Sequence, residues 1–165
     1  MKQTAPIEPA EGPGPAVSGE ARRLSPWTAA HRSFGYEITG TDFEGWPLEL
    51  IEESKHSDAN GRVGTRLLLE SSVARIWVIE LKPGERLPFH RHVLNYFWTV
   101  LTIGRACSRT PDGVTRHIWY QPKDNKHLTF RKGEGMIHDL ENIGETDLVF
   151  VTVELVQSEN APLNL

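Results

Sequence analysis

The stretch at residues 84–104, GERLPFHRHVLNYFWTVLTIG, carries the pattern from which the rest of the fold can be predicted. It begins at a Pro83-Gly84 turn, continues through His90 and His92, and ends in an apolar and aromatic run. In an extended strand, side chains two positions apart project from the same face. The two imidazoles are therefore predicted to point the same way from a stiff backbone, at about the spacing that one metal ion needs.

A third histidine lies downstream in the stretch GEGMIHDLEN, residues 133–142. Here His138 follows Gly135 by three residues and precedes Asn142 by four. An isolated His-x-His pair is weak evidence for a metal site, because such pairs occur by chance. A third histidine in a second strand with its own glycine turn makes the hypothesis stronger, and we expect the scaffold to bring His138 to the pair.

Two spacings in these stretches resemble the two halves of the cupin signature: Gly84-x5-His90-x-His92 and Gly135-x2-His138-x3-Asn142. The resemblance covers residues 65–156. Within the cupins, residues 64–92 are most similar to small stand-alone members grouped with the β-alanine-degradation cupins. The resemblance implies an all-β fold, a cupin-type jelly-roll β-barrel (double-stranded β-helix), with a metal ion held inside it.

The resemblance breaks where cupins usually have a glutamate ligand. That position falls on Tyr96 or Phe97, and the nearest polar neighbour is Asn95. The ligand set is thus reduced to the three histidines, as in the three-His cupins that include thiol dioxygenases and diketone-cleaving dioxygenases. Imidazole suits several divalent transition metals; we expect Fe(II) first, with Zn, Ni, Mn or Cu as alternatives.

Four residues are candidates for the surroundings of the metal. If Tyr96 and Trp98 share the face of His92, they line the metal cavity and Tyr96 can offer its hydroxyl to a substrate as the catalytic group; otherwise both are ordinary core aromatics. Asn95, Trp98 and Asn142 are predicted to support the ligands from behind. In a regular strand Asn95 would face away from Tyr96, so its role depends on a kink.

The remaining chemistry-bearing side chains are predicted to lie outside the site. Cys107 reads as a packed small hydrophobe, because no neighbouring histidine would activate its thiol. Glu85 and Glu134 stand in turns and do not replace the missing glutamate. The other four histidines are expected at the surface: His31, His56, His117 and His127. For His127, a position at the barrel mouth is the alternative.

The chain divides into four predicted regions. Residues 1–25 are rich in Pro, Gly and Ala and read as a disordered tail, with a short helix predicted from Ser25-Pro26 to Arg32. Residues 26–64 read as an N-terminal arm whose spaced aromatics pack on a barrel, its own or a partner's; a pair of edge strands is the alternative. The barrel is placed at residues 65–157 and a C-terminal tail at 158–165.

Within the barrel, short apolar and β-branched segments alternate with glycine turns, which is typical of a sandwich or barrel. A Pro111-Asp112-Gly113 hairpin turn is the strongest of these signals. The predicted strands are residues 66–70, 73–81, 90–103 as one run, 105–109, 114–120, 127–131, 136–142 and 148–156.

Composition narrows the partners. A formal charge of −4 and a pI near 6.0 give no reason to expect nucleic acid or an anionic membrane, and no apolar run approaches the ~18 residues of a membrane span. A single Cys107 excludes an intrachain disulfide, so we expect a cytoplasmic protein. Open sheet edges and the aromatic arm predict a homodimer.

We favour an enzyme, a three-His non-haem iron oxygenase of the dioxygenase type that acts on a small anionic or bidentate organic substrate. Three neutral imidazoles leave the charge of the ion uncompensated, which favours such a ligand. One alternative is a metal-loaded binding or sensing module without turnover. Another is a metal-assisted lyase, isomerase or hydrolase.

Overall fold

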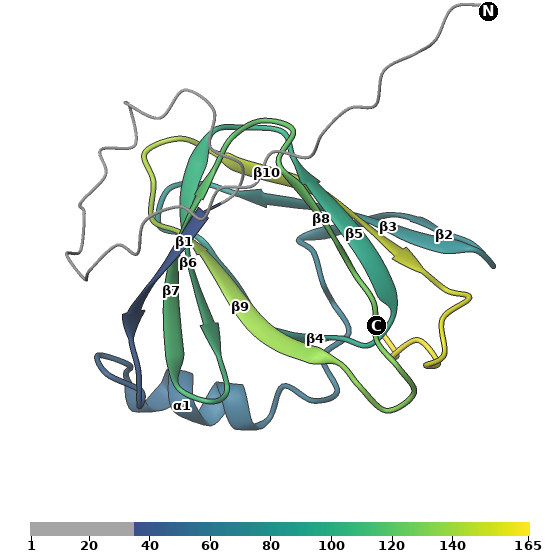
Figure 1. Ribbon diagram of the computed structural model, residues 1–165, viewed down its shortest axis with the longest axis horizontal. Coiled ribbons are helices and arrows are strands. Elements are labelled where there is room, and N and C mark those ends of the chain that lie inside the picture. Colours follow the sequence, from purple (N-terminus) through teal and green to yellow (C-terminus); the bar gives the residue numbers. More distant parts are fainter. Residues whose placement is uncertain (1–34) are drawn as a thin grey trace, which may run out of the picture. The chain divides into compact units, whose positions relative to one another are not determined.

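The computed structural model describes residues 35–165, which form two five-stranded antiparallel sheets and one short helix, α1 (Leu48–Lys55) (Figure 1). Sheet A has the strand order β1 (Gly35–Gly40), β7 (Val114–Tyr120), β6 (Gly104–Thr110), β9 (Met136–Asn142), β4 (Arg86–His92). Sheet B has the order β2 (Arg66–Glu70), β3 (Ala74–Leu81), β10 (Leu148–Leu155), β5 (Asn95–Val100), β8 (Asn125–Leu128). The predicted tail at 1–25, the predicted helix up to Arg32, and His31 lie outside the described residues.

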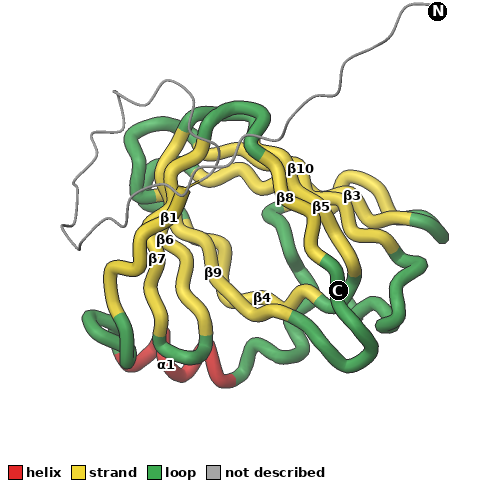
Figure 2. Tube along the Cα trace, viewed as in Figure 1, coloured by secondary structure: helices red, strands yellow, loops and turns green. Residues whose placement is uncertain are grey.

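The two sheets curve around a shared interior, as the strands in Figure 2 show. In each sheet a late strand is inserted between strands from earlier in the chain, so that β9 lies between β6 and β4, and β10 lies between β3 and β5. Strands that pair across such long intervals of sequence are the mark of a jelly roll. The predicted fold class, an all-β cupin-type jelly roll, is confirmed.

Strand β10 shows why these residues form a sheet with one buried face. In the segment LVFVTVEL, burial alternates along the whole strand, with Leu148, Phe150, Thr152 and Glu154 buried and the residues between them half-buried. A period of two is what an extended backbone imposes. The buried face joins residues from both sheets in one apolar core that is centred on Val100, Leu148 and Phe150.

The predicted continuous strand at 90–103 is wrong. β4 ends at His92 in sheet A, and β5 begins at Asn95 in sheet B. Val93 and Leu94, both buried, fill the corner where the chain changes sheets. Because a corner packed with apolar residues has the same hydropathy as a buried strand, the sequence pattern did not separate the two strands.

The residues before the first core strand contribute to sheet A. β1 pairs antiparallel with β7, so that Tyr36 lies opposite Ile118. α1 was not predicted; it begins after Pro47 without a side-chain cap. Its Leu50 packs with Trp46 and Phe89 in a small second cluster. The division into arm and barrel at residue 64 stays a prediction.

Within residues 35–165, the structure has no helix of the length and apolarity that crossing a membrane requires.

Candidate metal centre

The three predicted ligands meet inside the molecule. His90 and His92 lie on β4, His138 lies on β9, and the antiparallel register places His138 directly opposite His90. Their candidate ligand nitrogens all lie within 4.8 Å of one another. His90 and His92 are 1% and 3% exposed, and the ring centroids of His90 and His138 are 4.5 Å apart.

An irregularity in β4 aims the pair inward. The register shifts between Leu87 and His90, so that Leu87 enters the main core, Phe89 packs against Trp46 on the opposite side of the sheet, and His90 faces inward again. A bulge of this kind changes the direction in which a side chain points. Proline has no backbone N–H to donate to the strand ladder, so within sheets it is found at bulges and edges. Pro88 occupies the irregular stretch.

In His90 and His138, a hydrogen bond at Nδ1 leaves the Nε2 lone pair available to a metal. His90 Nδ1 lies 2.8 Å from the Pro88 carbonyl, which can only accept, so Nδ1 carries the proton. His138 Nδ1 donates in the same way to the Asp139 carbonyl at 3.0 Å. Nε2 of His90 and Nδ1 of His92 are buried without a hydrogen-bond partner, and Nε2 of His138 lies 3.2 Å from Nε2 of His92.

Burial keeps these imidazoles neutral. Desolvation lowers the pKa of His90 to about 4. The pKa of His138 falls to about 3, through burial and the neighbouring positive charge, and that of His92 lies well below its ordinary value for the same reasons. Neutral imidazoles with converging lone pairs fit a divalent transition metal. Within residues 35–165, no carboxylate or thiolate joins the cluster.

Of the two positions left open for Tyr96 and Trp98, the structure has both residues lining the interior that holds the histidines. The Tyr96 ring is buried and stacks on His92, with ring centroids 4.1 Å apart and an angle of 13° between the planes. Burial and the charges of Tyr120 and Glu154 raise the pKa of Tyr96 above its usual range, so the phenol stays protonated. Trp98 packs edge-on against Phe150 in the wall of the same interior.

The two asparagines form hydrogen bonds with the backbone of other segments and do not contact the histidines. Asn95 Oδ1 accepts a hydrogen bond from the Phe130 backbone N–H. Asn142 donates from Nδ2 to the Leu81 and Thr146 carbonyls. Asn95 faces away from Tyr96, as strand alternation requires, and Asn142 stands four residues along β9 from His138, about 13 Å at the rise of a strand.

Ser108 on β6 is a partner of His138 that the sequence did not indicate. Its Oγ lies 3.3 Å from His138 Nδ1 and donates to the Asp139 carbonyl at 2.9 Å. The hydroxyl and the carbonyl thus lie on the same side of the ring and fix its tautomer and orientation. No motif marks this serine, because it comes near His138 only through the pairing of β6 with β9.

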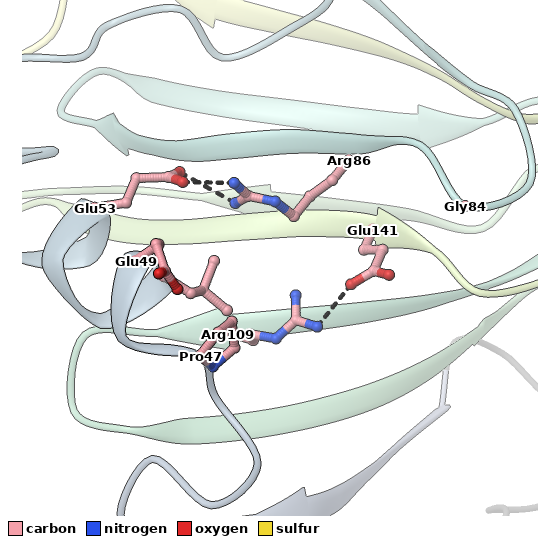
Figure 3. A pocket seen from close by; sticks show the side chains of 8 residues that line it. Pro47, Glu49, Glu53, Gly84, Arg86, Arg109 and Glu141 are labelled. Atoms are coloured by element: carbon pink, nitrogen blue, oxygen red, sulfur yellow. Dashed lines mark hydrogen bonds and ion pairs between the residues drawn. The ribbon is translucent and has the colours of Figure 1, made fainter.

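A chain of ion pairs between α1 and sheet A anchors the backbone beside the ligands (Figure 3). Asp139, which is fully buried, accepts hydrogen bonds from the Arg109 backbone N–H at 2.7 Å and from its Nη1 at 2.8 Å, and Arg86 Nη1 lies 3.3 Å away. Glu53 of α1 binds Arg86 and accepts from the Phe89 backbone N–H at 2.8 Å. The residues adjoining His138 and His90 are therefore both held from outside.

The ion-pair chain borders a cavity of about 390 Å³ that the three histidines do not line. Figure 3 shows its two arginines turned toward carboxylates, with Arg109 bound to Glu141 and Arg86 to Glu53. Its cationic groups are thus already neutralised. We assign this cavity a structural role.

A second cavity, of about 290 Å³, contains the histidine cluster, and we call it the histidine cavity. Its wall is mostly apolar and aromatic, with Tyr96, Trp98, Tyr120 and Phe150 around the ligands. Its cationic side chains are Arg116 and Lys126. His127, which was considered for the barrel mouth, is exposed and does not line this cavity. Cys107 is buried, as predicted, and burial raises the pKa of its thiol to about 11.

No family model and no curated protein matches this chain. Solved structures do resemble it. One is a cupin domain from Bordetella pertussis Tohama I, with 22% identity and a TM-score of 0.48 over 55% of this chain and 88% of that one. Another is an uncharacterized protein with a double-stranded β-helix domain from Klebsiella pneumoniae, with 24% identity and a TM-score of 0.45 over 73% of this chain and 93% of that one.

A third similar structure is a DMSP lyase from Ruegeria pomeroyi, with 18% identity and a TM-score of 0.40 over 58% of this chain and 47% of that one. Likenesses at this level bear on the fold alone. The β-alanine-degradation subgroup stays a prediction.

Proposed function

We propose that this chain is a metal-binding cupin in which His90, His92 and His138 hold a divalent transition metal. The observation that carries the proposal is a pair of buried ring nitrogens without a hydrogen-bond partner, Nε2 of His90 and Nδ1 of His92, beside the 3.2 Å contact between Nε2 of His92 and Nε2 of His138. Buried polar atoms are normally hydrogen-bonded. A cation bound at the cluster would satisfy the lone pair of His90 Nε2, which has no hydrogen-bond partner among the described residues.

We further propose that the native metal is Fe(II) and that the protein is an oxygenase for a small anionic or bidentate organic substrate. When bound, Fe(II) supplies the activation of O2 beside a coordinated anion. The three neutral imidazoles do not offset the charge of the ion, which favours an anionic substrate. The wall of the histidine cavity is mostly apolar and aromatic, and protonated Tyr96 is the proposed hydrogen-bond donor to the substrate.

The oxygenase proposal predicts oxygen consumption. Protein reconstituted with Fe(II) should take up O2 in an oxygen-electrode assay with at least one compound from a panel of thiols, diketones and α-keto acids. Zn-loaded protein and the His138→Ala variant serve as controls and should take up none. If Fe-loaded protein binds panel compounds without O2 uptake, the protein is a binding module. Product formation by the Zn form alone indicates a lyase or hydrolase, and either result overturns the oxygenase proposal.

Tyr96→Phe is expected to slow turnover by about ten- to a hundredfold, on the order of 1.4–2.7 kcal/mol in activation free energy. Phenylalanine keeps the ring that stacks on His92 and removes only the hydroxyl, so metal content should not change. The matched control is Tyr120→Phe, a buried tyrosine in the same cavity wall. Equal turnover in Tyr96→Phe and unchanged protein contradicts the donor role, and loss of metal makes Tyr96 a ligand instead.

A homodimer joined at sheet edges remains our expectation for the assembly. β1 is an edge strand of sheet A among the described strands, and its Tyr36 and Ile38 are 58% and 54% exposed. An exposed apolar edge is a ready template for pairing with a second copy. Sedimentation at micromolar concentration should show a dimer, and Ile38→Lys should shift it toward monomer. A monomeric unchanged protein contradicts the expectation.

A further inference from the structure

Arg116 points into the histidine cavity from sheet A. It lies on β7 opposite Ser108 of β6, the serine that contacts His138. Ile118 and Tyr120, two and four positions further along β7, belong to the main core, so Arg116 shares their inward face. Arg116 and the three histidines line the same cavity.

The guanidinium of Arg116 has most of its donors unused. Its Nη1 donates to Thr110 Oγ1 at 3.0 Å, and within residues 35–165 no carboxylate forms an ion pair with it. The half-buried arginines of the ion-pair chain behave differently, since Arg86 and Arg109 each bind two carboxylates. An arginine directed into an apolar cavity without a counter-ion leaves a charge poorly solvated. No carboxylate lines the histidine cavity.

Arg116 thus shares one cavity with the three histidine ligands. The cavity that it shares with them has a volume of about 290 Å³, near the lower end of the range for small-molecule sites. A ligand that reaches both the guanidinium and the histidines therefore has to be a small molecule. A guanidinium offers two parallel N–H groups that match a carboxylate.

We infer that Arg116 determines substrate specificity by binding a carboxylate of the substrate, while a second donor atom of the same molecule lies at the three-histidine site. The substrate class is then a small organic acid that carries a thiol, hydroxyl or carbonyl a few atoms from its carboxylate. Thr110 orients the guanidinium through its hydroxyl. The inference rests on the proposed function, because it needs a metal at the histidines.

The test uses full-length protein loaded with Co(II), whose visible absorption reports ligand binding. The probes are mercaptoacetate, 3-mercaptopropionate and 4-mercaptobutyrate, each compared with its neutral amide. Unchanged protein should prefer the carboxylate over the amide by about ten- to a hundredfold at one chain length, the energy of a charge-assisted hydrogen bond. If the carboxylate instead chelated the metal directly, the preference for carboxylate over amide would weaken steadily as the carbon chain of the probe lengthens.

Arg116→Gln should remove that preference while cobalt content and the circular dichroism spectrum stay unchanged, and Arg116→Lys should restore part of it. Arg105 is an exposed arginine that contacts Trp119. The Arg105→Gln variant makes the same change in net charge and should keep the preference. Lys126→Gln tests the other cation of the wall and should also keep it.

Two outcomes overturn the inference, namely an unchanged preference in Arg116→Gln or a loss of preference in Lys126→Gln instead. Failure of the proposed function looks different, because unchanged protein would then bind no cobalt at the histidines.

Discussion

The His138→Ala protein is expected to bind Fe(II), Co(II) or Zn(II) at least about a hundredfold more weakly than unchanged protein. Mutating a residue that hydrogen-bonds to a metal ligand weakens metal affinity by about 10–100-fold, and removing one of three ligands should weaken it more. The β-sheet circular dichroism signal should stay the same, because the apolar core centred on Leu148 and Phe150 does not include the histidine. Metal content after dialysis, measured by plasma emission spectroscopy, checks the prediction.

His127→Ala is the matched control. His127 is exposed on β8 and belongs to no metal cluster among the described residues, so its removal should leave the metal content as it was. The metal assignment fails if His138→Ala retains a full equivalent of metal, or if His127→Ala loses it equally.

Asp139→Asn is expected to destabilise the fold by about 3 kcal/mol, the lower end of the range for breaking a buried ion pair. Asp139 is fully buried between Arg109 and Arg86, and an amide of the same shape leaves each guanidinium with a single carboxylate partner, Glu141 and Glu53 respectively. Burial raises the pKa of this carboxyl, against the influence of the two arginines. Urea unfolding of the metal-free protein measures the free energy of unfolding.

The same variant should bind metal more weakly, since Asp139 holds the β9 backbone beside His138 through the Arg109 backbone N–H. Asp58→Asn is the control, because its pair with Arg91 at 3.5 Å is largely exposed and exposed pairs contribute little. Equal stability of the two variants would show that the ion-pair chain is not structurally important.

The sequence was sufficient for most of the strands, because their apolar segments are separated by glycine turns. Strands β3, β7, β9 and β10 end within one residue of the predicted bounds. The corner at Val93-Leu94 and the helix α1 were not found. An apolar corner has the hydropathy of a strand, and α1 buries only Leu50 and Ser54, which is too little to show a helical period.

The histidine positions could be predicted because strand alternation fixes the direction of each side chain once the motif is seen. The same rule offered the cavity wall as one of two positions for Tyr96 and Trp98, with the ordinary core as the alternative. It does not give the depth along a strand or the pairing between distant strands. The predicted support of the ligands by Asn142 failed for this reason, because Asn142 lies too far from His138 along β9. Ser108 and Arg116 become neighbours of the ligands only through the pairing of β6, β7 and β9.

The most direct test of the metal assignment is a crystal structure of the metal-loaded protein with anomalous scattering data at the absorption edge of the metal. We expect a single peak bound by Nε2 of His90, His92 and His138, with metal–nitrogen distances near ~2.0–2.2 Å. A metal-loaded crystal with no peak at these three nitrogens, or with a ligand histidine turned to solvent, would contradict the account.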